Sequence, residues 1–308
     1  MSLRLLLLLV WVIGFSFCGN ENAVVAQDSP PKIKTLIVDG QNNHRWAQTT
    51  PVIKEVLEKS GRFTVEVATS PTQEEKKANP EEYRKKLDAF KPAFENYDLV
   101  VMNYNGDEWS AATKQSFEQF VADGGGLVIY HAANNSFPNW KEYNEMCALG
   151  GWGGRNEKSG PYLYWKDGKP VRDESAGPGG HHGPQWEYLI EVRAPEHPIM
   201  KGLPKSFRHA KDELYDLLRG PAKNVTILAT AFAAQDKGGT NRDEPLLMVI
   251  DYGKGRVFHT CLGDNESQCR SVSFIVTFLR GAEWAATGNV TIPVPDDMPG
   301  TETPTFRK

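Results

Sequence analysis

The first half of the chain repeats one pattern, in which a short apolar run is followed by a polar loop and then by a segment with helical spacing. The apolar runs occupy residues 32–39, 63–68, 99–102 and 127–130, and helices are expected at 49–60, at 81–90 and after Ser110. Strands that alternate with helices in this way predict a mostly parallel sheet with helices on both faces. The sequence therefore predicts a doubly wound α/β fold.

The strand expected at residues 127–130 is preceded by Gly124-Gly125-Gly126 and followed directly by His131. Ligands of open α/β sheets bind at the carboxyl ends of the strands, which is where this imidazole is expected. No cysteine or serine stands beside it, which argues against acyl-transfer chemistry. The alternative interpretation is a core histidine bonded to the backbone. Because the glycines precede the strand, they do not predict a nicotinamide-binding loop.

The second half of the chain begins with a change of pattern. Residues 134–184 are rich in glycine, proline, aromatic and charged residues, and this stretch is too long for an ordinary connection. We expect it to be a functional insertion or lid. Strands with hairpin-like turns are expected at residues 185–193, 225–232, 244–252 and 256–262, followed by a helix at 268–286. The proline-rich tail, residues 287–308, is expected to lie on the surface or to be loose.

The N-terminus has the pattern of a secretory signal peptide. Arg4 precedes an apolar run at residues 5–17, and the small residues at 23–26 offer a cleavage site after Ala26. We therefore expect residues 1–26 to be removed, leaving a periplasmic or extracellular protein without a membrane anchor. The run is short for a membrane span, although an uncleaved anchor remains the alternative.

Charge and cysteine content exclude some classes of protein. The net charge is −4, and the basic residues are scattered, so binding to nucleic acid is not expected. Behind the signal peptide stand Cys147, Cys261 and Cys269, an odd number that does not describe a disulfide framework. One bridge between Cys261 and Cys269 and three buried free thiols are both open interpretations.

Imidazoles and carboxylates recur near the ends of expected strands. His44 follows the first strand, His131 follows the fourth, and Asp212 and Glu213 stand together in a later run. Loops at the carboxyl edge of a doubly wound sheet converge, and an imidazole beside a carboxylate makes an acid/base pair. The competing interpretations are an ordinary loop histidine for His44, and helix capping or arginine pairing for the two acids.

A divalent metal ion is a second use for these residues. His44, His131 and His182, together with a carboxylate, offer nitrogen and oxygen ligands from separate loops. No close-spaced ligand motif supports such a site, and the adjacent His181 and His182 are more typical of a solvated loop. No other cofactor is expected.

The expected insertion and the residues just after it are unusually dense in large aromatic side chains. Aromatic faces beside polar loops suit the apolar faces of sugar rings, but they also pack loops together. We expect packing for most of them and ligand contact for one or two, Trp152 among these. The residues are Trp140, Trp152, Tyr162, Tyr164, Trp165 and Trp186.

Several motifs spread over residues 32–286 together resemble the ThuA-like family, named for trehalose utilisation. They are Asn43-His44, Gly125-Gly126-Leu127-Val128 leading into His131-Ala132-Ala133, Glu196-His197-Pro198-Ile199, Asp212-Glu213-Leu214-Tyr215, Gly253-Lys254-Gly255-Arg256-Val257-Phe258 and Arg280-Gly281-Ala282-Glu283-Trp284-Ala285. The resemblance implies a flavodoxin-like sheet of the class I glutamine amidotransferase type, with an aromatic-rich insertion. It also implies carbohydrate metabolism, with oxidised (keto) disaccharides as candidate substrates.

The resemblance places His131 near the elbow that holds the amidotransferase cysteine, so glutaminase activity is expected to be absent. One departure from the family pattern stands out. Family members commonly show Leu-Gly-His after the Gly-Lys-Gly-Arg strand, whereas this chain has Leu262-Gly263-Asp264. If that histidine is catalytic in relatives, Asp264 substitutes for it with a different charge.

These observations lead to one principal hypothesis and one alternative. The principal hypothesis is a secreted isomerase, lyase or hydrolase for a small sugar, in which His131 acts as general acid or base with Asp212 or Glu213. The residues expected to bind the substrate are His44, Asn43, Asp264, Trp152 and His181. The alternative is a non-catalytic carbohydrate-binding or scaffold protein with the same fold.

Overall fold

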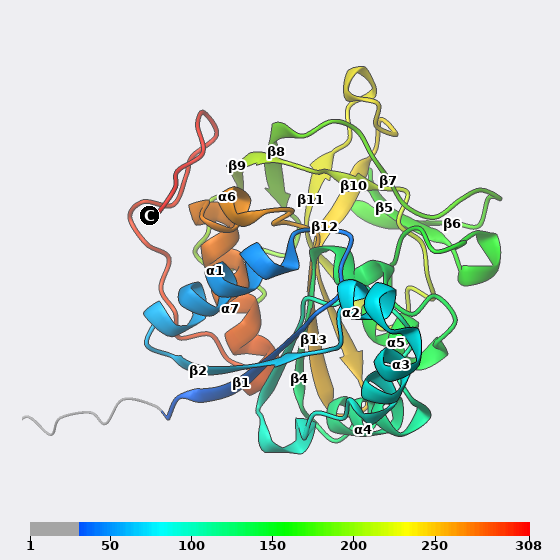
Figure 1. Cartoon of the computed structure of the whole chain (residues 1–308). Helices are drawn as coiled ribbons and strands as arrows, with labels where there is room; N and C mark the ends of the chain where they lie inside the picture. The colour runs from blue at the N-terminus through cyan, green and yellow to red at the C-terminus, as the bar shows by residue number, and fades with distance from the viewer. Residues whose placement is uncertain (1–30) are drawn as a thin grey trace, which may run out of the picture. The chain divides into compact units, whose positions relative to one another are not determined.

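Parallel strands form the centre of the sheet, in the order β2-β1-β3-β4-β13 (Figure 1). The structure is a computed structural model that describes residues 31–308. The five strands are β1 (Ile33–Asp39), β2 (Phe63–Thr69), β3 (Leu99–Met102), β4 (Gly126–Tyr130) and β13 (Gly255–Thr260). The order 2-1-3-4 is that of flavodoxin-like sheets, in which the chain reverses its winding direction between β1 and β3. The predicted α/β fold class is confirmed.

Antiparallel strands extend the sheet beyond β13. They are β12 (Asp243–Tyr252), β11 (Val225–Phe232), β8 (Trp186–Val192) and β9 (Ser206–Asp212), which follow in that order. Strand β9 was not predicted, because its sequence has only two apolar residues, Phe207 and Ala210, among polar and charged ones. Within the described residues the whole sheet has 11 strands, including a hairpin formed by residues 162–173.

Helices cover both faces of the sheet. On one face α1 (Trp46–Lys59) packs beside α7 (Val272–Thr287), and on the other lie α4 (Ala111–Ala122) and α5 (Lys141–Cys147), as Figure 1 shows. The remaining helical and short elements are α2 (Gln73–Ala78), α3 (Pro80–Ala89), α6 (Glu266–Cys269), η1 (Phe94–Asn96), η2 (His131–Asn135), η3 (Glu157–Ser159), η4 (Gln235–Lys237), β7 (His181–His182) and β10 (Tyr215–Asp216).

The single helix expected at residues 268–286 is wrong at its start, because two helices occupy this region. Ser271 has an extended backbone and caps α7, with its Oγ accepting a hydrogen bond from the backbone N–H of Phe274. A serine at this position satisfies an amide that the helix itself leaves free, and it therefore favours a new helix start over continuation. The preceding residues form the short helix α6 instead.

The stretch at residues 134–184 carries regular structure of its own. After α5 it contains the hairpin of β5 (Tyr162–Lys166) and β6 (Lys169–Asp173), which joins the sheet through β12. Arg155 is buried, and its guanidinium donates to the carbonyl oxygens of Asn135, Ser136 and Gly151. These bonds tie the turns after β4 to the loop that carries Trp152.

The C-terminal tail lies along the surface and is bonded to it. The carbonyl oxygen of Gly300 accepts from the backbone of Arg208, and that of Thr305 accepts from the first amide of α7, Val272. Of the two arrangements expected for the tail, the structure shows the bonded one.

The expected signal peptide, residues 1–26, lies outside the described residues. Within residues 31–308 no helix combines the length and apolarity needed to cross a bilayer.

The three cysteines of the described chain are free thiols, and all three are buried. This decides between the two open interpretations of the sequence in favour of unpaired thiols. Cys147 and Cys261 flank the buried imidazole of His259, with Sγ atoms 4.0 Å from Nδ1 and 3.7 Å from Nε2. Burial lowers the pKa of His259 to about 4, so this imidazole is a neutral core group.

Candidate functional site

Four loops bring two imidazoles and two carboxylates together above one edge of the sheet. His44 follows β1, His131 follows β4, Asp264 follows β13, and Glu213 comes directly after β9. Since β1, β4 and β13 run parallel, their carboxyl ends lie at the same edge. One nitrogen or oxygen atom from each of the four side chains lies within 4.8 Å of the others. We call these four residues the imidazole–carboxylate cluster.

His131 has a backbone conformation that is rare for a residue with a side chain. Its φ is 46°, in the left-handed region, at the point where β4 gives way to η2. Such a conformation costs about 1–3 kcal/mol and tends to mark functional sites. The sharp turn is held because Nδ1 of His131 lies 2.7 Å from the carbonyl oxygen of Cys261. A carbonyl can only accept, so Nδ1 carries a proton and Nε2 faces the cluster.

The surroundings of His131 favour its charged form. Its side chain is only 2% exposed, and its Nε2 lies 3.6 Å from Oε2 of Glu213 and 3.9 Å from Oδ1 of Asp264. Burial acts to lower the pKa of His131, but the negative charges of Glu213 and Asp212 outweigh it, and the pKa is raised above its ordinary value. The surroundings therefore stabilise a proton on this imidazole.

His44 and Asp264 form the second imidazole–carboxylate pair. Nδ1 of His44 lies 2.5 Å from Oδ1 of Asp264, and the amide of Gln185 donates to the other oxygen of the same carboxylate. Burial acts to raise the pKa of Asp264, but the bond to His44 and the nearby imidazole of His131 outweigh it, so the pKa is lowered. Asp264 is therefore a stable anion that orients His44.

Tyr215 joins the two imidazoles and was not singled out by the sequence analysis. Its hydroxyl oxygen lies 2.9 Å from Nε2 of His131 and 3.3 Å from Nε2 of His44. The hydroxyl has one proton, so it can donate to only one of these two nitrogens at a time. Burial raises the pKa of Tyr215 well above its usual range, which keeps the phenol protonated. The signal for it was present in the Asp212-Glu213-Leu214-Tyr215 motif.

The adjacent acids Asp212 and Glu213 have different surroundings. Asp212 is fully buried and accepts hydrogen bonds from His209 and from the backbone amides of Gly263 and Asp264. It therefore holds the loop that presents Asp264. Glu213 is the acid that faces the cluster, and its buried Oε2 has no hydrogen-bond partner. Of the two acids considered from the sequence, Glu213 is placed beside His131.

The other residues expected to bind substrate are divided between the cluster and its periphery. Nε2 of His182 lies 3.7 Å from Oε1 of Glu213, and the ring of Trp152 packs edge-on against Tyr215 with centroids 4.9 Å apart. His181 turns away to pair with Asp216 at 2.7 Å. Asn43 is exposed and accepts a hydrogen bond from Asn105. Trp152 and His182 thus border the cluster, whereas His181 and Asn43 bond elsewhere.

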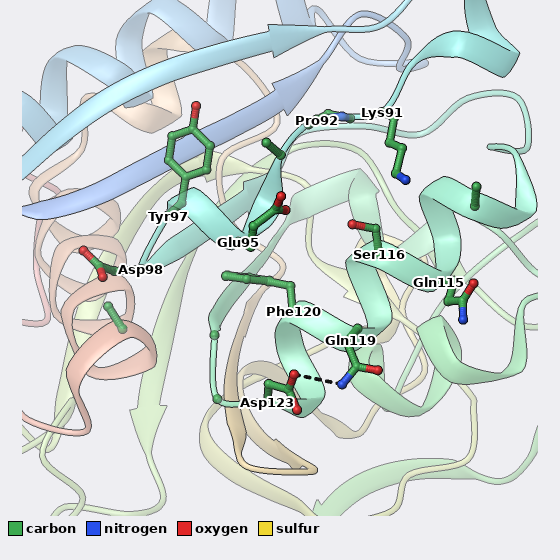
Figure 2. Close-up of a pocket in the computed structure, with 15 residues that line it drawn as sticks. Lys91, Pro92, Glu95, Tyr97, Asp98, Gln115, Ser116, Gln119, Phe120 and Asp123 are labelled. Atoms are coloured by element: carbon green, nitrogen blue, oxygen red, sulfur yellow. Dashed lines mark hydrogen bonds between the residues drawn. The ribbon is translucent and has the colours of Figure 1, made fainter.

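A wide hollow of about 940 Å³ lies at the opposite edge of the sheet, near the amino ends of β3 and β4. Figure 2 shows the side chains around it, among them Lys91, Glu95 and Asp98, and the hydrogen bond from Gln119 to Asp123. Its lining contains no histidine and no member of the imidazole–carboxylate cluster. Its size therefore does not make it the better candidate, because acid/base groups gather at the other edge.

Comparisons with known proteins agree with the resemblance that the motifs indicated. A ThuA-like protein of known structure from Parabacteroides merdae is 50% identical, with a TM-score of 0.84, and the match covers 90% of this chain and 98% of that one. A ThuA-like protein from Bacteroides uniformis is 21% identical, with a TM-score of 0.53 and coverage of 85% and 94%, and supports the fold alone. No protein with a curated description matches the chain.

The family model for ThuA, described as trehalose utilisation, matches residues 34–285. This span contains the parallel strands, the antiparallel extension and all four loops that supply the imidazole–carboxylate cluster. The chain therefore belongs to the ThuA family.

Proposed function

We propose that this protein is an exported enzyme that processes an oxidised (keto) disaccharide or a related sugar by proton transfer at the imidazole–carboxylate cluster. The observation that carries the proposal is the contact between His131 and Glu213, whose Nε2 and Oε2 atoms lie 3.6 Å apart. Imidazole and carboxylate are the groups that most often exchange protons with a substrate near neutral pH. The family description, trehalose utilisation, supports a sugar as substrate.

The chemistry begins with removal of a proton from a carbon next to the sugar ketone. The electron pair of the broken C–H bond moves toward the carbonyl oxygen and gives an enolate. The proton then returns at another carbon, or a neighbouring C–O bond breaks and its oxygen leaves with a proton. The side chain of Glu213 keeps 13% exposure, whereas that of His131 is only 2% exposed. Glu213 therefore takes the proton from the substrate carbon and shares it with Nε2 of His131, from which it returns to the product.

The residues around this pair suit a sugar. Tyr215 and the paired His44 and Asp264 offer hydrogen bonds to hydroxyl or enolate oxygens. Trp152 supplies an aromatic face beside them, of the kind that packs on sugar rings. The family resemblance implies that His131 lies near the elbow that holds the cysteine of amidotransferases, and an imidazole does not supply that thiol, so no glutaminase activity is proposed.

The test is hydrogen exchange at the carbon beside the ketone. Keto derivatives of trehalose and other disaccharides are incubated with the protein in D2O, and deuterium uptake and product formation are followed by NMR. Wild type is expected to exchange or convert at least one of these sugars. His131→Gln and Glu213→Gln are each expected to lower the rate by about 100-fold or more, because each removes one member of the proton-transfer pair.

His197→Asn is the matched control. This histidine lies against Trp284 at the amino edge of the sheet, and asparagine keeps an acceptor for the amide of Ile199. The control is expected to exchange sugar at the wild-type rate. If wild type and His131→Gln bind the sugars equally and neither exchanges nor converts any of them, the protein is a carbohydrate-binding or scaffold protein and the enzyme proposal fails.

A further inference from the structure

We infer that His44, His131, Glu213 and Asp264 together bind one divalent transition-metal ion of the Zn²⁺ or Mn²⁺ class. The inference deepens the proposed function and rests on it for the reaction, whereas the binding of the ion is a separate property. From the sequence, a metal was only a second use for His44, His131 and His182 together with an unspecified carboxylate. The structure replaces that set with two imidazoles and two carboxylates.

The spacing of the four side chains fits a single ion. Ligand atoms bonded to one metal at about 2.0–2.2 Å lie roughly 3–3.5 Å from one another in tetrahedral or octahedral arrangements. Nε2 of His131 lies 3.6 Å from Oε2 of Glu213 and 3.9 Å from Oδ1 of Asp264, and the full set spans no more than 4.8 Å. Side-chain movements of up to about one ångström bring them to bonding distance.

The carboxylate of Glu213 contains an atom that the protein itself leaves unbonded. Oε2 of Glu213 is buried and has no hydrogen-bond partner, although a charged oxygen in this position is costly to leave unpaired. It lies beside Nε2 of His131. An ion between these two atoms bonds to both and removes the cost.

The ligands are also oriented as metal ligands usually are. Nδ1 of His131 donates to the carbonyl oxygen of Cys261, so Nε2 is the nitrogen that bonds to an ion once its proton has left. Bonding of the outer nitrogen to a backbone carbonyl is the common way in which proteins fix a ligating imidazole. The hydroxyl of Tyr215 lies 2.9 Å from the same Nε2, so this hydrogen bond has to give way when an ion binds there.

Outer contacts hold the carboxylates in the same way. Asp212 fixes the backbone of Gly263 and Asp264, and Gln185 bonds the oxygen of Asp264 that points away from His44. Glu213 has His182 beside its other oxygen, at 3.7 Å. The site is therefore arranged before an ion arrives, and little ordering is needed on binding.

The ligand types select the class of ion. Two imidazole nitrogens and two carboxylate oxygens suit Zn²⁺, Mn²⁺ and their neighbours, whereas Ca²⁺ and Mg²⁺ prefer sites made of oxygen alone. The two carboxylates balance the charge of a divalent cation in a place where His44, Glu213 and Asp264 keep only 12–15% exposure. Such an ion would polarise the carbonyl oxygen of a bound keto sugar and so make the neighbouring C–H bond more acidic, with His131 and Glu213 as its ligands.

The test measures metal content and affinity directly. The full chain is stripped with a chelator, dialysed against Zn²⁺ or Mn²⁺, and analysed for bound metal and by titration calorimetry. Co²⁺ in place of Zn²⁺ gives a visible absorption band that reports imidazole and carboxylate ligation. Wild type is expected to bind about one ion per chain and to melt at a higher temperature as the free ion concentration rises.

Three conservative variants and one control identify the site. His44→Gln and Asp264→Asn change partly exposed groups, so they are expected to fold, and each should weaken the affinity roughly tenfold or more. Glu213→Gln should do the same, and circular dichroism checks that it is folded. His197→Asn should bind the ion as wild type does. Failure of stripped wild type to take up any of the three ions overturns the inference, as does uptake that all three cluster variants leave unchanged.

The outcomes for metal and for sugar are separable. If wild type binds the ion at the cluster but converts no sugar in either form, the metal site stands and the proposed function fails. If stripped wild type exchanges the sugar proton at full rate and added ions neither bind nor alter the rate, the proposed function stands without the metal.

Discussion

At the level of single residues, the adjacent acids Asp212 and Glu213 have different roles because their side chains point to opposite faces of the sheet. Asp212 is the last residue of β9 and Glu213 the next one, and successive residues of a strand point to opposite sides. Asp212 therefore lies beneath the loop of Gly263 and bonds its amides, while Glu213 faces His131. Sequence alone shows two adjacent acids and cannot say which of them meets the imidazole.

Glu244 is a buried acid outside the cluster, and it makes stability depend on pH. Burial raises the pKa of Glu244 to about 8, although Thr240 donates a hydrogen bond to it. The folded protein thus keeps a proton on Glu244 that the unfolded chain releases above its ordinary value of 4.5. Because the folded state binds the extra proton, the free energy of unfolding falls as the pH rises from 4.5 through about 8.

Glu244→Gln is expected to remove most of this dependence, since glutamine keeps the acceptor for Thr240 and has no charge. Urea unfolding at about pH 9 should show the variant more stable than wild type by about 2–4 kcal/mol, and the difference should shrink toward pH 5. Glu187→Gln, at an exposed position of β8, serves as the control and should leave the profile unchanged. Parallel pH profiles for wild type and Glu244→Gln contradict this account.

Much of the candidate site could be predicted from the sequence, and the missing part has a physical explanation. His44 and His131 were expected at one edge because each follows a strand of a parallel sheet, whereas Asp264 was expected there from its place in the family motif. Tyr215 was missed because a tyrosine next to a leucine indicates core packing as readily as a functional site. Its position between the imidazoles depends on how β10 folds back on β7, and two-residue strands leave no pattern in a sequence.

At the level of elements, the close approach of α7 to β13 depends on a missing side chain. A Cβ added to Gly281 in α7 meets the ring of Phe258 in β13 at 2.2 Å, far inside any real contact. Helices generally gain about 1 kcal/mol when an interior glycine becomes alanine. Here the ring and the sheet below it leave no room for a Cβ, so the cost of overpacking outweighs the gain in helix propensity.

Gly281→Ala is therefore expected to lower the free energy of unfolding by about 1–3 kcal/mol in spite of the better helix propensity. Chemical denaturation followed by circular dichroism measures it. Gly300→Ala is the matched control, because a Cβ there meets nothing within 4 Å, and it should change stability very little. An increase in stability for Gly281→Ala means that the helix moves away from the sheet at low cost.

The strands differ in how clearly they can be predicted from the sequence. Strands β3 and β4 are apolar runs buried on both faces, and β1 contains such a run at its centre, so all three were predicted to within a few residues. Strand β9 lies at the end of the sheet order, and its sequence, SFRHAKD, is mostly polar. An outer strand can remain polar because only part of it packs on the core, so its sequence carries little signal.

At the level of the whole molecule, the C-terminal tail closes a groove between α1 and α7. Residues of both helices, including Val56, Ile275 and Leu279, line a hollow together with Arg307 and Lys308. The same stretch pairs Phe306 with Ser271 and accepts a hydrogen bond from the first amide of α7. The tail thus covers apolar side chains and also satisfies a helix end.

Removal of residues 304–308 is expected to lower the free energy of unfolding by about 1–3 kcal/mol, because it frees buried amides and exposes apolar side chains. The midpoint of urea unfolding should fall, with little change in its slope. Removal of Lys308 alone is the control and should have a small effect. Sugar turnover should persist in the truncated protein while it is folded, since the tail contributes nothing to the imidazole–carboxylate cluster. An unchanged midpoint for the five-residue deletion contradicts a supporting role for the tail.

The three buried thiols can report local unfolding of the protein. Burial raises the pKa of Cys147 to about 12 and raises the pKa of Cys261 and Cys269 as well, so none of them is a thiolate in the folded state. A maleimide or disulfide reagent can react with them only when the surrounding strands separate. The rate of labelling in native buffer therefore measures how often this part of the protein unfolds locally, without any probe being attached in advance.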